Sequence, residues 1–257
     1  MRSDSKTEAM GVRVADRRVI LVTGAARGVG AETARALASR GHHVLVNYRV
    51  KRTRAESLVA EIQERGGVAT AIGADITQPR SLSALVARVS ELTGGLDALV
   101  LNASGGLERG ADAGYPMRIN RDAQVTLVEA MTPLLRPGSR VVFVTSHQAH
   151  FVGTHEVPAD YGPVAASKSA GEKAIRERQA GLARKGIGVS VVSGDMIEGT
   201  MIVRLLERRD PDAVGTRRDV APLPTVNEFA SAVADEATRA GTTAISVFVG
   251  GSDYLAS

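Results

Sequence analysis

Seven short runs of apolar residues constrain the fold of this 257-residue chain more than any other feature. Most of the stretches between these runs have the periodicity of amphipathic helices. An unbroken apolar run is typical of a strand buried on both faces, and helices between such strands cover a parallel sheet. We therefore predict an α/β fold with a doubly wound, seven-stranded parallel sheet and helices on both faces. The strands are expected at 19–23, 43–47, 68–72, 98–101, 141–145, 189–192 and 244–249, and the helices at 31–40, 54–65, 81–92, 118–135, 163–184 and 227–240.

The domain organisation is expected to be simple. No linker, repeat or low-complexity stretch divides residues 17–257, which we predict to be a single domain. Residues 1–16 are mixed polar and are expected to form a flexible tail. Because this tail has no apolar core and no run is long enough to span a membrane, we expect a cytoplasmic protein without a membrane partner. For the charged segment 201–226, predicted as a helix followed by a loop, a mobile lid and plain surface are both open.

Composition excludes several function classes. The chain has no cysteine, which rules out disulfides, thiolate metal sites and a cysteine nucleophile, and we expect no metal site. Lys and Arg outnumber Asp and Glu by 32 to 28, a surplus of +4 that invites a nucleic-acid interpretation. Aromatic residues make up only 3% of the chain and Trp is absent, so a surface for stacking bases is poor. We therefore expect no nucleic-acid partner.

A glycine-rich turn, Thr23-Gly24-Ala25-Ala26-Arg27-Gly28-Val29-Gly30, joins the first predicted strand to the first predicted helix. Glycines at this place let the backbone turn sharply and approach a pyrophosphate. The N-terminus of the following helix offers free N–H groups and the positive end of its dipole to the same anion. The position of the turn predicts a dinucleotide-binding site of the Rossmann type.

The spacing Thr-Gly-x-x-x-Gly-x-Gly resembles the short-chain dehydrogenase/reductase family, and the resemblance extends over about residues 17–251. Ala74-Asp75-Ile76 resembles the adenine-contacting turn of the family, and Asn102-Ala103-Ser104-Gly105 resembles its Asn-Ala-Gly motif, with Ser104 where glycine is usual. The stretches Val46-Asn47-Tyr48 and Val249-Gly250-Gly251 are similar to NADP-dependent 3-oxoacyl-carrier-protein reductases. The resemblance implies cofactor contacts from Gly24, Ala26, Arg27, Gly28, Val29, Gly30, Asn47, Tyr48, Arg49, Ala74, Asp75, Ile76, Asn102, Ala103, Ser104, Lys168 and Thr200.

The end of the second predicted strand favours NADPH over NADH. A carboxylate there would bind the ribose hydroxyls of NAD and repel a 2′-phosphate, but the chain has Tyr48 and Arg49 instead. Arg27 in the glycine turn adds a second cation, and guanidinium groups bind phosphate in a bidentate manner. Lys51 and Arg52 follow, and for these two a solvated loop is an equal alternative.

The family resemblance also implies a catalytic set. Ser146 would bind the substrate oxygen, Asn120 would support a water held by a lysine, and Lys168 would bind the nicotinamide ribose and lower the pKa of a tyrosine. A tyrosine has an ordinary pKa near 10 and needs nearby positive charge to exchange protons at neutral pH.

The tyrosine of the family pattern Tyr-x-x-x-Lys is missing. Val164 stands four residues before Lys168, and the nearest tyrosine is Tyr161. On a continuous helix, seven residues rise roughly 10.5 Å against about 6 Å for four. Because Gly162 and Pro163 favour a helix start, we expect Tyr161 just before the helix, with its hydroxyl folded back to serve as the proton donor. The alternatives are a structural tyrosine, or an acid among His147, His150 and His155, which are individually expected on a loop surface.

After the sixth predicted strand, Thr200 matches the threonine that meets the nicotinamide carboxamide in the family. Asp195 and Glu198 would either line the substrate pocket or cap the following helix, and capping is favoured.

The predicted function is an NADP(H)-dependent oxidoreductase that transfers hydride between NADPH and a carbonyl or secondary alcohol, on a small-molecule or carrier-bound substrate. The alternative is an NADP(H)-binding sensor with little or no catalysis, which the displaced tyrosine would favour. By analogy with the family, helices 118–135 and 163–184 would pair in a homodimer or homotetramer.

Overall fold

The computed structural model describes residues 17–107, 112–155, 157–209, 211–251 and 253, so the tail predicted at 1–16 lies outside the described residues. All strand pairs are parallel, as predicted, and the seven strands are ordered β3-β2-β1-β4-β5-β6-β7. The chain adds β2 and β3 on one side of β1 and β4 to β7 on the other, so the boundary between β1 and β4 is the switch point of the sheet. Ligands of such sheets bind beyond the carboxyl ends of the strands at this point. The strands are β1 Val19–Val22, β2 His43–Tyr48, β3 Val68–Gly73, β4 Leu96–Leu101, β5 Leu135–Ser146, β6 Gly188–Gly194 and β7 Ile245–Val249.

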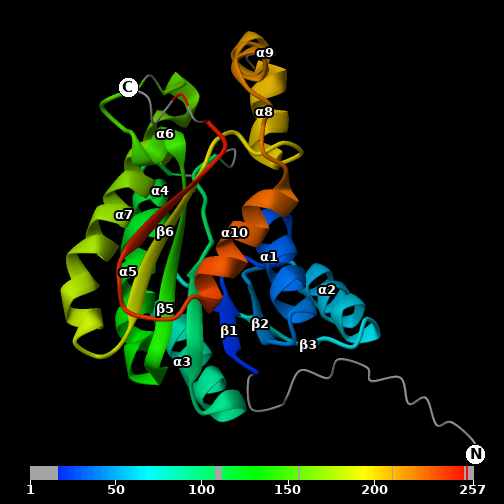
Figure 1. The fold of residues 1–257 in the computed structure, drawn as a ribbon, viewed down its shortest axis with the longest axis vertical. Coiled ribbons are helices and arrows are strands. Elements are labelled where there is room, and N and C mark those ends of the chain that lie inside the picture. Colours follow the sequence, from blue (N-terminus) through cyan, green and yellow to red (C-terminus); the bar gives the residue numbers. More distant parts are fainter. Residues whose placement is uncertain (1–16, 108–111, 156, 210, 252, 254–257) are drawn as a thin grey trace, which may run out of the picture.

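Helices cover both faces of the sheet (Figure 1). Successive side chains of β1 alternate between the two cores, because Leu21 packs into one, while Ile20 and Val22 pack into the other. Leu21 faces α3 (Pro79–Thr93), α5 (Ala123–Met131) and α7 (Gly162–Ala183). The opposite face is covered by α1 (Gly28–Ser39), α2 (Arg52–Glu64) and α10 (Val226–Thr238). None of the helices in the described part of the chain is both long and apolar enough to cross a membrane.

The single helix predicted at 118–135 is wrong, because the chain changes its winding several times there. It passes through α4 (Tyr115–Met117), a π-helical turn (Arg118–Asp122), α5 and a 3-10 turn (Thr132–Leu134). A Cβ on Gly171 of α7 would lie 2.1 Å from the Asn120 carbonyl oxygen, so α7 packs directly against the π-helical turn. A proline in the 3-10 turn ends the helix, and β5 begins six residues before the predicted strand.

The segment expected to be a helix and a loop at 201–226 contains two helices, α8 (Met201–Arg209) and α9 (Pro211–Val220). They pack on each other through the buried side chains of Val203, Leu206 and Val214. Figure 1 shows the pair standing above the carboxyl edge of the sheet, next to the start of α10. Two further short elements, α6 (His147–His150) and the 3-10 turn η4 (Ala159–Tyr161), lie between β5 and α7.

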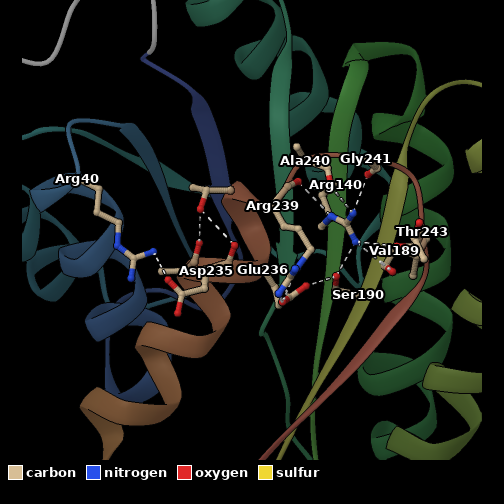
Figure 2. Close-up of polar contacts among 12 residues, drawn as sticks. Arg40, Arg140, Val189, Ser190, Asp235, Glu236, Arg239, Ala240, Gly241 and Thr243 are labelled. Carbon is tan, nitrogen blue, oxygen red and sulfur yellow. Dashed lines mark hydrogen bonds and ion pairs between the residues drawn. The ribbon is translucent and has the colours of Figure 1, made fainter.

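A buried polar network lies at the amino end of β6, opposite the carboxyl edge of the sheet (Figure 2). Arg140, at 0% exposure, donates to the Ser190 hydroxyl and to carbonyl oxygens of the loop before β7. Ser190 in turn donates to the Glu236 carboxylate at 2.6 Å, and Arg239 donates to the same carboxylate at 2.8 Å. These bonds join β5, β6 and α10 and hold the loop that leads into β7.

Candidate active site

The glycine turn has the backbone that the sequence predicts. Gly24 and Gly28 have φ angles of +63° and +55°, a region that favours glycine. A Cβ on Gly30 would lie 2.5 Å from the Asn102 side-chain nitrogen, so only glycine fits between the turn and the end of β4. A Cβ on Gly28 would meet no heavy atom within 4 Å, so this peptide faces open space.

Side chains hold the turn to its neighbours. The Thr23 hydroxyl donates to the Val100 carbonyl at 3.1 Å and accepts from the backbone N–H groups of Asn102 and Ala103, each at 3.0 Å. The Asn102 amide donates to the Thr23 carbonyl at 2.9 Å. Asn47, at 2% exposure, donates its amide to the carbonyls of Ile72 and Ala74. The predicted contact residues Asn47 and Asn102 therefore position the backbone around the turn.

The start of α1 fits a dinucleotide pyrophosphate. Arg27 is the N-cap residue, its φ of −164° is extended, and its side chain makes no capping hydrogen bond. The first turn contains no acidic residue, so the N–H groups of Val29 and Gly30 and the positive end of the helix dipole stay available to an anion. Ser104, in the loop after β4, is exposed.

The predicted adenine turn follows β3. Ala74 and Ile76 are buried, at 6% and 5% exposure, and the Ala74 N–H donates to the Tyr48 carbonyl at 2.8 Å. Asp75 accepts from the backbone and hydroxyl of Thr77 through one oxygen, at 2.9 and 2.7 Å. The Tyr48 ring lies against Gly73, where a Cβ would be 3.0 Å away.

The cations predicted for a 2′-phosphate lie at the surface. Arg27, Arg49 and Lys51 are exposed beyond the ends of β1 and β2. Arg49 donates to the Tyr115 hydroxyl, and its guanidinium carbon lies 5.7 Å from the centre of that ring. Arg52 is part of α2 and pairs with Glu56 at 2.7 Å, which favours the surface interpretation for this residue.

Ser146 and Tyr161 meet beyond the end of β5. Ser146 is the last residue of β5, and its Oγ lies 3.0 Å from the Tyr161 hydroxyl. Tyr161 ends η4 and is the N-cap residue of α7, so the expectation that it lies just before the helix is confirmed. Val164, where the family has its tyrosine, is 2% exposed and packs with Ala149 and Ala165.

Lys168 and Asn120 are also buried. Lys168 is 9% exposed, and within the described residues its ammonium group makes no hydrogen bond or ion pair. Asn120 donates to the Gly105 carbonyl and to the Ser167 hydroxyl, both at 2.9 Å. The π-helical turn thus ties α7 to the loop after β4, beside the switch point. Ser167, as the partner of Asn120, was not anticipated from the sequence.

Burial shifts the pKa values of the tyrosine and the lysine in opposite directions. Burial raises the pKa of Tyr161, and the hydrogen bond with Ser146 partly offsets this. Burial without a counter-charge lowers the pKa of Lys168 from 10.5 to about 8. Lys168 is not among the groups that shift the pKa of Tyr161, so the expected coupling between them is not visible here.

The expectation of surface positions is wrong for His147. Its side chain is 0% exposed, and its ring nitrogens lie 2.8 Å from the Ser193 hydroxyl and 3.0 Å from the Gly250 carbonyl. Burial lowers the pKa of His147. His150 lies 2.9 Å from a carboxylate oxygen of Glu172, on the side of α7. The structure thus gives two of the three histidines structural contacts.

The favoured capping role of Asp195 and Glu198 is also wrong. Thr200 caps α8, because its hydroxyl accepts from the Val203 N–H at 3.4 Å. Asp195, with a side chain at 0% exposure, instead forms an ion pair with Arg217 at 2.7 Å. Glu198 pairs with Arg218 at 2.8 Å. Both carboxylates are therefore bound to α9, a contact that no sequence signal singled out.

A narrow crevice opens beside the Tyr161 side chain, between η4 and α8. Apart from Tyr161, the residues that line it were not predicted individually, because their segments contain no substrate motif. Its lining is mostly apolar, and within the described residues no group of three or more metal-ligating side chains is found near it or elsewhere. The crevice is lined by Leu107, Asp160, Tyr161, Ile202, Leu205 and Leu206.

Comparison with known proteins agrees with this geometry. The family described as short chain dehydrogenase matches residues 18–210. The 1-cyclohexenylcarbonyl-CoA reductase of Streptomyces collinus is 32% identical over 193 residues, 72% of this chain and 67% of that reductase. The angucycline C-6 ketoreductase LanV with bound NADP has a TM-score of 0.77 at 25% identity, over 91% of this chain and 95% of that chain. A short chain dehydrogenase from Burkholderia cenocepacia J2315 in complex with NADP has a TM-score of 0.76 at 29% identity, over 93% and 98%.

The chain belongs to the short chain dehydrogenase family. The predicted fold, family and oxidoreductase class are confirmed, and the NADP-bound relatives agree with the predicted dinucleotide, NADP(H). The closer resemblance to 3-oxoacyl-carrier-protein reductases stays a prediction.

Proposed function

We propose that the protein is an NADPH-dependent carbonyl reductase in which Tyr161, rather than a residue at position 164, donates the proton. The observation that carries the proposal is the distance of 3.0 Å between the Ser146 Oγ and the Tyr161 hydroxyl. Two hydroxyls this close can both hydrogen-bond to one substrate oxygen. Val164 has no acidic group that could donate a proton, and its side chain is buried in an apolar cluster.

The residues around the switch point would hold the cofactor. The glycine turn and the start of α1 fit the pyrophosphate, and Arg27 and Arg49 are within the region that a 2′-phosphate would occupy beyond β1 and β2. Lys168 supplies three N–H donors that no described acceptor takes, which suits ribose hydroxyls. When bound, NADPH supplies the hydride that reduces the carbonyl carbon.

The chain's own residues then manage the proton. Ser146 holds the carbonyl oxygen, and the Tyr161 hydroxyl transfers its proton to that oxygen as negative charge develops there. The hydrogen bond with Ser146 is the contact that lowers the pKa of Tyr161, while the ammonium group of Lys168 would orient the ribose of the cofactor. Asn120 and Ser167 hold α7 at the depth that places Lys168 in the site.

Replacement of Tyr161 by Phe tests this role. We expect kcat/KM for a carbonyl substrate to fall about 10²–10⁴-fold, because only the proton donor is removed. The affinity for NADPH, measured by its fluorescence, should stay within about twofold. Tyr115→Phe is the matched control, since it removes a hydroxyl that contacts Arg49 and should leave kcat unchanged.

Unchanged turnover in the Tyr161→Phe variant would refute the role of this tyrosine. The alternative of an NADP(H)-binding sensor makes a different prediction. If the wild-type protein binds NADPH but oxidises it with no ketone or aldehyde in a broad panel, the sensor is correct and the reductase is not.

A further inference from the structure

Helix α8 forms an apolar wall next to the proposed proton donor, and α9 packs against α8. Ile202, Leu205 and Leu206 of α8 line the crevice that also contains Tyr161. Ile202 is 39% exposed, one of four large apolar side chains that the described residues leave exposed, and it lies beside this crevice. Leu206 also packs against Val214 of α9, so the position of α8 depends on the position of α9.

One buried side chain connects α9 to the sheet. The Arg217 side chain is only 10% exposed, and it reaches Asp195, the residue directly after β6, at 2.7 Å. It also pairs with Asp253 at 2.6 Å. Burial alone would lower the pKa of Arg217, but the two carboxylates outweigh it and raise the pKa above its ordinary value.

The residues around this ion pair are closely packed. A Cβ on Gly251 would lie 2.8 Å from the His147 ring and 3.1 Å from both the Arg217 guanidinium and the Asp195 carboxylate. Gly251 has a φ of +59°, so it serves here both for its conformation and for its size. His147 directly follows Ser146. Gly251 therefore lies between the ion pair and the ring of the residue that follows Ser146.

We propose that Arg217 is a positioning residue that holds α8 and α9 as an apolar wall beside Tyr161, and that this wall selects carbonyl substrates with a bulky apolar group. The selection rests on the proposed reductase function, whereas the positioning does not. A buried ion pair suits this task because its geometry is fixed, while surface pairs contribute little to stability or order. The apolar group of the substrate would cover Ile202 and Leu205.

Arg217→Met tests the positioning directly. This variant keeps most of the apolar stem and removes the charge, so we expect faster hydrogen exchange in 201–220 without ligand and unchanged exchange in β1 and β4. Arg218→Met is the matched control, because Arg218 is the next residue on α9, is 40% exposed and pairs with Glu198 and Glu207 at the surface. The control should exchange like the wild type.

Steady-state kinetics test the selection with two probe substrates, a long-chain aliphatic methyl ketone and hydroxyacetone. In the Arg217→Met variant, KM for the aliphatic ketone should rise about 10-fold or more, and KM for hydroxyacetone should change less than about twofold. The affinity for NADPH should not change. Arg217→Lys, which restores one charge, should recover part of the low KM.

The double variant Asp195→Asn with Arg217→Met covers the case in which an unpaired buried Asp195 prevents folding, and it should show the same exchange and kinetics. Wild-type exchange in 201–220 in both variants would overturn the positioning. Equal rises in KM for the two ketones would overturn the selection. If the wild-type protein reduces no carbonyl, the proposed function and the selection both fall, and the exchange measurement still decides the positioning.

Discussion

Two buried cations of this protein, Arg140 and Lys168, differ in whether the folded chain supplies hydrogen-bond acceptors for them. Arg140, at the amino edge of the sheet, is 0% exposed and donates to a serine hydroxyl and to several backbone carbonyls (Figure 2). Lys168, towards the carboxyl edge, is 9% exposed and makes no hydrogen bond or ion pair with any described residue. Burial lowers the pKa of both groups, but only Arg140 has the acceptors that offset its loss of hydration.

The difference separates the two tasks of the sheet. At the amino edge the protein completes its own polar network, which fixes the loop before β7 and contributes to stability. At the carboxyl edge it keeps a charge without a partner, which costs stability and leaves a donor for a ligand. We therefore assign Arg140 to folding and Lys168 to function, and three measurements test this assignment.

Lys168→Met should change both activity and stability. We expect kcat/KM to fall about 10²-fold or more, because the donor proposed to hold the nicotinamide ribose in place is lost. The free energy of unfolding at pH 7 should not fall and should rise by about 1–3 kcal/mol, since an unpartnered buried charge is replaced by an apolar side chain of similar length. Urea unfolding and steady-state kinetics measure the two quantities.

Lys173→Met on the exposed side of α7 is the control for this prediction. It should change neither kcat/KM nor stability by more than about 0.5 kcal/mol. A Lys168→Met variant that unfolds more easily than the wild type would show that Lys168 is structural, and the comparison would fail.

Arg140→Met should have the converse effect. The free energy of unfolding should fall by about 3–5 kcal/mol, because buried carbonyls and Ser190 lose their donor. The kcat/KM of the folded protein at low temperature should stay within about threefold, since the network lies at the edge of the sheet opposite the site. Arg136→Met on the same strand is the control. Arg136 is 42% exposed and pairs with Asp97 at 3.0 Å, so its loss should cost about 1 kcal/mol or less.

The parallel sheet with helices on both faces could be predicted from the sequence, because unbroken apolar runs such as 141–145 are buried on both faces whatever their partners are. The glycine turn could be predicted for a similar reason, since its conformation depends on neighbours along the chain. The position of Tyr161 just before α7 followed from Gly162 and Pro163 alone.

Polar residues whose environment comes from distant segments could not be predicted. In the sequence, Arg140 and His147 could not be distinguished from surface residues, because their partners are distant along the chain. Ser190 lies 50 residues from Arg140, and Ser193 and Gly250 lie 46 and 103 residues from His147. The pairing of Arg217 with Asp195 spans 22 residues with no periodic signal between them. Burial of a charge depends on acceptors that only the folded chain brings together.

The smallest expected effect is a pH dependence of stability that isolates Lys168. Its pKa is lowered from 10.5 to about 8 in the folded protein, so between these pH values the unfolded chain binds more protons than the folded one. Stability must therefore rise with pH in this window, as the folded protein sheds the buried charge before the unfolded chain does. We expect the free energy of unfolding of the wild type, measured relative to that of the Lys168→Met variant, to increase by about 1–2 kcal/mol between pH 7 and 9.5.

Taking the difference between the two proteins cancels the titration of groups that they share, and stopping at pH 9.5 limits the ionisation of unfolded tyrosines. Saturating NADP should flatten the dependence, because ribose hydroxyls bound to the ammonium group favour its charged form. A difference that is flat with pH in the absence of NADP would mean that the Lys168 ammonium is already satisfied in the folded protein, as the Arg140 guanidinium is. The contrast between the two edges of the sheet would then rest on geometry alone.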